Sequence, residues 1–269
     1  MSGDLVQFLV SLPLPVMLLV ALSVPLLMAF AIGQMILSAF TPQELTANST
    51  VGIAKYGFVV EVYAVVAALT LVGSWEIYQT SRDHLQREAG GLYLLALSVP
   101  SYGEAAQAPR RAEMYASLRD YASAVATKDW PHMIAANGRS GSDVEFQRLT
   151  RAFVDAEPLT GAQQALAQNV VGWIAQVSEA RIARLSQHSR TFGTLIWILV
   201  LTVSVAVLVF QWFVGSASNG VHYAMGAVIA LIVGVVIVVA GKLGFPFNGE
   251  PPFLSPSPFY QMMAVGLSL

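Results

Sequence analysis

Four long apolar runs divide this chain of 269 residues and set its organisation. The runs are Leu14 to Ser38, Phe58 to Tyr78, Phe192 to Val214 and Tyr223 to Ala240. Each is close to the roughly 20 residues that a helix needs to cross about 30 Å of hydrocarbon. Because a helix satisfies its own backbone hydrogen bonds in lipid, we expect four membrane-spanning helices.

The long polar segment between the second and third runs has the spacing of helices. Its apolar positions recur every three or four residues, at Met114, Leu118, Tyr121 and Val125, which is typical of a half-buried helix. A further helix is expected to begin at Ser142, with Glu145 three residues later as in a capping box.

Both ends of this polar segment continue the adjoining membrane helices. After Glu76 the helical pattern persists until Gly90 and Gly91 weaken it. Before the third run, a helical stretch begins at Thr160, with Gln163 completing a capping box, and continues without a stop signal into the membrane. We therefore predict two antiparallel stalk helices that form a four-helix bundle with the two helices between them.

The predicted fold class is all-α, a four-span membrane protein with a cytoplasmic helical stalk and bundle between the second and third spans. The expected regions are the first two membrane helices in residues 1–78, the bundle in residues 79–191, the last two membrane helices in residues 192–244, and a tail rich in proline and phenylalanine in residues 245–269. Within the tail, Pro258 after Ser257 is expected to start a last short helix.

The basic residues indicate the orientation of the chain. Of 14 lysines and arginines, 12 lie between Arg82 and Arg190, and the other two are Lys55 and Lys242. Cytoplasmic loops carry an excess of such residues. We therefore expect a multi-pass protein of the inner membrane with the bundle and both termini in the cytoplasm.

Two groups of side chains are expected at the membrane surfaces. A strip of three arginines is predicted to contact anionic lipid head groups: Arg181, Arg184 and Arg190. Four aromatic residues are predicted to anchor the helix ends at the interface: Trp75, Tyr78, Trp197 and Trp212.

Composition supports a membrane protein and argues against an enzyme. Hydrophobic residues make up 55% of the chain and charged residues 11%, and the mean hydropathy is +0.61. The absence of cysteine excludes disulfides, thiolate metal sites and a cysteine nucleophile. No phosphate-binding loop, dinucleotide fingerprint or serine elbow occurs, so we expect no catalytic residues, no cofactor and no nucleic-acid partner. His84 and His188 could form a metal pair, but the absence of converging ligands favours solvated or interface histidines and no metal.

Glu61 is the sharpest candidate for function, because it lies a few residues inside the second apolar run, where an ionisable group is costly. Glu76 follows 15 residues later, and steps of about 100° leave the two carboxylates about 60° apart on one helix face. The small residues Ala64 and Ala68 lie on or beside this face. The face could line a water-filled path or pack against another helix, with Glu61 reaching the outer water or Lys55.

Several blocks of the sequence together resemble one family. They are VYAVVAALTLVGSWEIY, QREAGGLY, LRDYASAVATKDWPHM, SEARIARLSQ, and FPFNG with LSPSPF. This combination, from about Phe58 to Phe259, resembles the bacterial bestrophin-like domain of unknown function. The resemblance implies an oligomeric ion channel with helical cytosolic extensions, and bestrophins conduct anions. The two glutamates on the predicted pore face would favour cations.

Pattern and resemblance together predict an oligomeric bestrophin-like ion channel whose second membrane helix lines the pathway. The expected partners are membrane lipids and further copies of the chain. The alternative is a non-conducting membrane-anchored protein whose bundle binds a soluble cytoplasmic partner. A lipid-modifying enzyme is a third possibility for which the chain offers no catalytic constellation.

Overall fold

The computed structural model describes residues 2–135, 140–186, 194–216 and 218–266, and the chain divides into two compact units. The membrane unit comprises residues 1–78 and 191–251, and the bundle unit comprises residues 79–190 and 252–269. All regular elements in the described residues are helical, which confirms the predicted all-α class.

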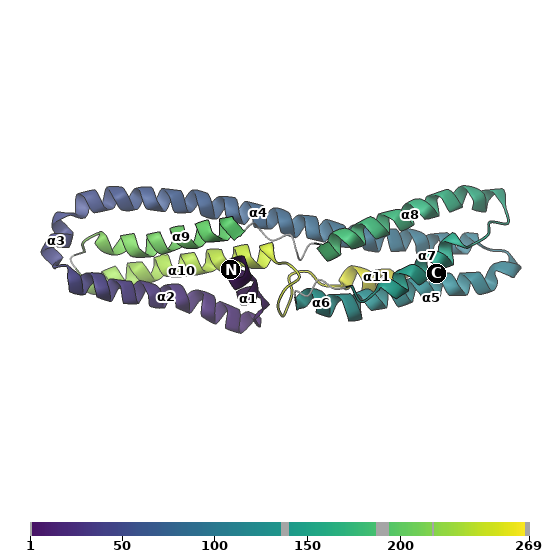
Figure 1. Ribbon diagram of the computed structural model, residues 1–269, viewed down its shortest axis with the longest axis horizontal. Helices are drawn as coiled ribbons and strands as arrows, with labels where there is room; N and C mark the ends of the chain where they lie inside the picture. Colours follow the sequence, from purple (N-terminus) through teal and green to yellow (C-terminus); the bar gives the residue numbers. More distant parts are fainter. Residues whose placement is uncertain (1, 136–139, 187–193, 217, 267–269) are drawn as a thin grey trace. The chain divides into compact units, whose positions relative to one another are not determined.

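The membrane unit is built from long apolar helices (Figure 1). Its elements are α1 (Ser2–Ser11), α2 (Leu14–Ala39), α3 (Pro42–Ala47), the first part of α4 (Ser49–Ser98), α9 (Thr194–Phe210) with a 3₁₀ turn (Gln211–Phe213), and α10 (Asn219–Gly244). Four helical segments are long and apolar enough to cross a membrane, namely Leu14–Ala39, Ser49–Ser101, Thr194–Phe213 and Asn219–Gly244. They correspond to the four predicted runs.

Small residues allow these helices to pack closely. A Cβ atom on Gly234 of α10 would lie 2.6 Å from the Ala21 carbonyl oxygen of α2, and one on Gly33 would lie 2.6 Å from the Trp212 ring. Neither position could carry a larger side chain without a shift of its neighbour. Close backbone approach of this kind is how membrane helices gain packing energy when lipid offers no hydrophobic driving force.

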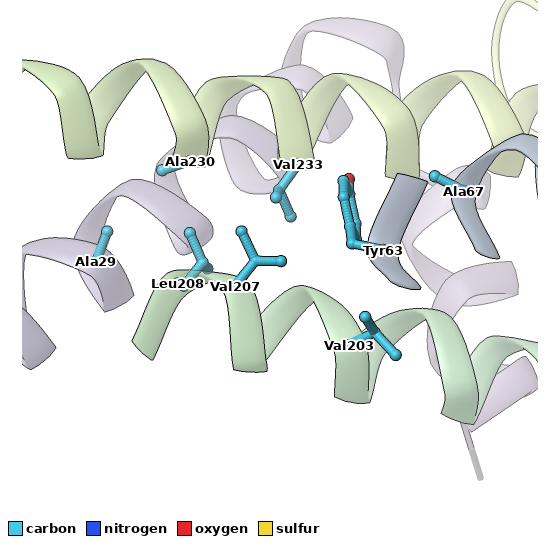
Figure 2. Close-up of a cluster of buried hydrophobic side chains, with 8 residues drawn as sticks. All are labelled: Ala29, Tyr63, Ala67, Val203, Val207, Leu208, Ala230 and Val233. Carbon is cyan, nitrogen blue, oxygen red and sulfur yellow. The ribbon is translucent and has the colours of Figure 1, made fainter. Parts of the chain in front are cut away.

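One apolar cluster joins all four long helices of the membrane unit (Figure 2). Tyr63 of α4 packs among Val203 and Val207 of α9 and Val233 of α10. Ala29 of α2 completes the cluster from the other side. The buried face of α4 is therefore fixed by contacts within a single chain.

The structure differs from the sequence predictions at two places in this unit. Helix α1 was not predicted, and its Val6 and Val10 are buried against α10 and Trp197. Trp197 and Trp212, expected at the interface, are almost fully buried, whereas Trp75 is 51% exposed. Tryptophan occurs both in cores and at interfaces, and its position along a run does not distinguish the two.

The bundle unit contains the second part of α4 and shorter helices. These are α5 (Ala108–Ala124), a π-helical turn (Val125–Asp129), α6 (Trp130–Ile134), α7 (Asp143–Val154), α8 (Gly161–Ser186) and α11 (Ser257–Gly266), with 3₁₀ turns at Val99–Ser101 and Ala105–Gln107. Helix α11 packs against α5 and buries Phe259, so the end of the tail belongs to the bundle. Met114, Leu118, Tyr121 and Val125 are all buried, as their spacing predicts.

Helix α4 does not weaken at its two glycines but continues to Ser98. A Cβ atom on Gly91 would lie 2.5 Å from a methyl group of Val177 in α8, whereas the space beside Gly90 is open. Gly91 therefore serves close packing between two helices rather than a helix end, and packing outweighs its low helix propensity.

The two predicted caps are only partly present. Thr160 accepts a hydrogen bond from the Gln163 backbone N–H at 3.2 Å, but the Gln163 side chain accepts from Leu159 rather than from Thr160. Ser142 precedes α7 but does not cap it, because its hydroxyl donates to Asp129 at 2.7 Å. The predicted continuity of the second stalk helix into the third membrane helix depends on residues 187–193, which lie outside the described residues.

Candidate ion pathway and a buried charge cluster

Helix α4 has one face that packs within the membrane unit and one face that does not. Tyr63, Ala67, Thr70 and Ser74 are buried, and successive residues of this set are three or four positions apart. Glu61, Ala64, Ala68 and Glu76 are all exposed in the single chain. Taking about 100° per residue, the two sets lie on roughly opposite sides of the helix. The four predicted pathway residues thus share a face that no other helix in the described part of the chain covers.

Glu61 lies at the depth of the apolar cluster. It is two residues from Tyr63, which places the two residues about 3 Å apart along the helix axis. Its neighbours Val59 and Val62 pack against the same cluster. An exposed carboxylate at this depth faces either hydrocarbon, which is costly, or a polar surface supplied by something other than this chain.

Lys55, the possible partner of Glu61 within the chain, does not form an ion pair with it. Within the described part of the chain, neither Lys55 nor Glu61 takes part in an ion pair. Val65 and Val72 flank the carboxylates on the same face and are strongly exposed. The face is therefore mixed, with two acidic groups, two small alanines and exposed apolar side chains.

A second polar site, which the sequence reasoning missed, lies inside the bundle unit. Arg184 of α8 is fully buried, and its guanidinium donates to both carboxylate oxygens of Glu88 in α4, at 2.7 and 3.0 Å. The same group donates to Asp129 at 2.9 Å. Tyr121 of α5 donates to Glu88 at 2.6 Å. The Arg184 guanidinium also lies 5.9 Å from the centre of the Phe259 ring of α11. One arginine therefore links helices that are distant in sequence.

Hydrogen bonds compensate the charges of this cluster. Asp129 accepts from the backbone N–H groups of Gly141 and Ser142 at 2.7 and 3.0 Å. Burial alone would lower the pKa of Arg184, but the Glu88 carboxylate raises it, and the net shift is upward. Burial, followed by the nearby Glu88, raises the pKa of the Tyr121 hydroxyl well above its ordinary value. Arg184 thus stays charged and Tyr121 stays a hydrogen-bond donor at every physiological pH.

The structure gives the three predicted lipid-contacting arginines different surroundings. Arg184 is fully buried, so its guanidinium is not available to a lipid head group. Arg181 is also largely buried, where it pairs with Asp143, donates to Ser140 at 2.6 Å and covers the Phe146 ring. Arg190 lies outside the described residues, so its contact with lipid stays a prediction.

Acid is expected to weaken the contact between Arg181 and Asp143. Hydrogen bonds from Arg181 and then Ser140 lower the pKa of Asp143 below its ordinary value. A depressed pKa contributes stability that is present above the unfolded value of about 3.9 and is lost as the pH falls through the folded value. Because the side chain is 60% exposed, we expect at most about 1 kcal/mol. Urea unfolding of wild type and Asp143→Asn in nanodiscs should differ at pH 6, and the difference should shrink as the pH falls below the unfolded value of about 3.9 and through the lower folded value. A constant difference across this range would contradict the assignment.

Metal binding finds no support in the described residues, which hold no group of three or more side chains able to bind a metal ion. His188 lies outside them. The pair of His84 and His188, the less favoured interpretation of these two histidines, therefore lies partly outside the described residues.

Comparison with known proteins places the chain in a family. It matches the Bestrophin-like domain over residues 16–252. A bacterial bestrophin homologue from Klebsiella pneumoniae, crystallised with a single substitution, superimposes with a TM-score of 0.70 at 9% identity, covering 93% of this chain and 98% of that one. A crystal structure described as a membrane protein gives 0.70 at 10% identity, covering 93% and 97%. A search of curated proteins gives no match. The match over most of its length shows that this chain is a membrane protein belonging to the Bestrophin-like domain family.

Proposed function

We propose that the protein is an oligomeric ion channel in which the exposed face of α4 lines the pathway. One observation carries the proposal, namely the exposure of Glu61 at the depth of the apolar cluster. Exposure to hydrocarbon would cost about 3 kcal/mol or more for each ionised group. A ring of several copies around a water-filled axis removes this cost, because the same face of each copy then meets water.

The chemistry of this face favours cations. Rings of carboxylates are the usual device of cation-selective pores, and each copy would supply Glu61 and, about 22 Å along the helix, Glu76. The exposed Ala64 and Ala68 leave room between these two levels. The distribution of basic residues supports an inner-membrane location with the bundle and both termini in the cytoplasm.

Cysteine substitution tests which face of α4 meets water. The chain contains no cysteine, so each variant carries a single thiol on an inert background. In liposomes that contain the purified protein, Ala64→Cys and Ala68→Cys should react with a positively charged methanethiosulfonate reagent, and the attached cationic group should block most of the cation flux by repelling the permeating ions. Ala67→Cys is the matched control, because Ala67 is buried against the neighbouring helices.

Two results would refute the pathway. One is equal reactivity at the three positions. The other is full reaction at Ala64→Cys and Ala68→Cys without any loss of flux. Wild-type protein treated with the same reagent should keep its flux, because it has no thiol to react.

A membrane-anchored interaction protein is the second candidate. It is favoured by the exposed ridge of α4 in the bundle unit, where Gln86, Gly90 and Tyr93 stand between two open depressions of about 590 and 310 Å³. A soluble partner could cover this ridge. Under this hypothesis the purified protein conducts no ion, and Tyr93→Ala weakens partner capture without changing the stability of the protein. Robust cation flux from the purified wild-type protein would refute it as the main function.

A further inference from the structure

A cavity of about 360 Å³ lies at the end of the membrane unit where α2 ends and α4 begins. Its volume is in the range of small-molecule sites. The apolar wall is formed by Phe40, Leu45, Val51 and Phe213 among others. The ring centres of Phe40 and Phe213 are 5.9 Å apart in an edge arrangement, and both Phe40 and Val51 are strongly exposed.

Helix α4 approaches the 3₁₀ turn closely beside this cavity. A Cβ atom on Gly52 would lie 3.0 Å from the Phe213 carbonyl oxygen, so glycine permits a contact that a larger residue would strain. This contact places the backbone of Phe213, one of the phenylalanines of the wall, directly against α4. The cavity is a built feature of this end of the membrane unit.

Two side chains of opposite charge line the cavity, and they differ in their hydrogen-bond partners. One carboxylate oxygen of Glu44 accepts from the backbone N–H and the hydroxyl of Thr41, each at 2.8 Å, as part of a helix cap. Within the described part of the chain, Lys55 has neither an ion-pair partner nor a side-chain hydrogen bond. Its ammonium therefore offers three donors to a ligand.

Lys55 also stands apart from the other basic residues. The membrane unit contains one further lysine or arginine, Lys242, which is almost fully buried. Lys55 is exposed, so it is the basic side chain of this unit that a ligand can reach. An apolar cavity with an accessible ammonium at its rim complements an apolar chain that carries an anionic head.

We propose that this cavity binds a single-chain anionic amphiphile, a carboxylate of fatty-acid type, with its head group on Lys55 and its chain between the phenylalanines. The volume accommodates one short chain rather than the two chains of a phospholipid. The site is separate from the α4 face that carries Glu61. The proposal does not rest on ion conduction and goes beyond it.

The experiment uses the full chain in nanodiscs of phosphatidylcholine, which contain no anionic lipid. A decanoic acid that carries a diazirine is bound and photolysed, and its adducts are located by mass spectrometry. We expect adducts in residues 40–55 and 210–213, and we expect unlabelled decanoate to prevent them. Decyltrimethylammonium, which has a chain of the same length but the opposite charge, should compete poorly.

Three variants locate the head group. Lys55→Gln should reduce labelling about tenfold, the effect of losing one charged hydrogen bond. Lys55→Arg should retain most of it. Glu44→Gln preserves an acceptor for the cap while removing the negative charge, so labelling should rise. Because Lys55 is exposed, its replacement should leave folding intact, and unchanged unfolding midpoints would verify this.

Three results would overturn the proposal. Equal labelling of Lys55→Gln and wild type would show an apolar surface without a head-group site. Equal competition by decyltrimethylammonium would also show that the cavity has no site for an anionic head group. Competition by phosphatidylglycerol but not by decanoate would show that a diacyl phospholipid is the ligand.

Discussion

Replacing Arg184 with methionine is expected to reduce the free energy of unfolding of the bundle by about 3–5 kcal/mol. The reason is that Glu88 and Asp129 would both remain buried without their shared cation. Removing one partner of a buried ion pair costs far more than the pair itself contributes. Urea or guanidinium unfolding in nanodiscs, followed by the signal of the bundle helices, measures the change.

Matched variants separate this effect from simple loss of charge. Arg184→Lys keeps the charge but loses the two-pronged contact with Glu88, so an intermediate destabilisation is expected. Arg148→Met removes an exposed pair with Asp120 and should cost less than about 1 kcal/mol. Adding Glu88→Gln to Arg184→Met should cost less than the sum of the two single changes, because the second change removes an unpaired charge. Strict additivity would show that the two side chains do not act as a unit.

The all-α fold could be predicted from the sequence because each helix carries its own signal. Membrane helices are defined by length and hydrophobicity, which are local properties. The grouping of Glu61, Ala64, Ala68 and Glu76 on one face of α4 was also predictable, since these residues are related by the helical repeat alone, whereas the repeat does not say whether another helix covers that face. Helix α1 escaped prediction because its 10 residues are too few to span a membrane, and packing rather than length stabilises it.

The charge cluster could not be predicted as a cluster, because Glu88, Asp129 and Arg184 come from three separate segments and only tertiary packing brings them together. A weaker signal was nevertheless present. Glu88 lies three residues after Leu85 and four before Leu92, and both leucines are buried. A carboxylate within an apolar stripe implies a buried partner, but the stripe does not identify which arginine supplies it.

The assignment of arginines to the membrane surface failed for a related reason. Counting basic residues near a helix end gives the orientation of a chain but not the direction of each side chain. Arg181 and Arg184 are three residues apart on α8, and both face the bundle interior. Nearness to the membrane in sequence therefore does not imply contact with lipid, because both side chains bind partners within the bundle.

Glu61→Gln is expected to reduce cation flux by at least about fivefold while leaving folding and assembly intact. A unit charge about 4 Å from an ion contributes about 1 kcal/mol even in bulk water, and the contribution grows as the surroundings become less polar. Each copy in an oligomer would supply one such charge. Flux of potassium and of chloride into proteoliposomes, measured separately, gives both the size and the selectivity of the pathway.

The control for this variant is Glu113→Gln, which removes an exposed carboxylate of the bundle that pairs with Arg110. It should leave the flux unchanged.

The pathway and the helix interface respond differently to glutamine at position 61. In a pathway the variant assembles normally and conducts differently, because water had already solvated the carboxylate. In an interface between copies the variant changes the stability of the assembly, because a desolvated charge has been removed, and the wild type shows no flux to alter. Absence of flux from wild-type protein for several cations and anions would therefore retire the channel and leave the anchored interaction protein as the function of this fold.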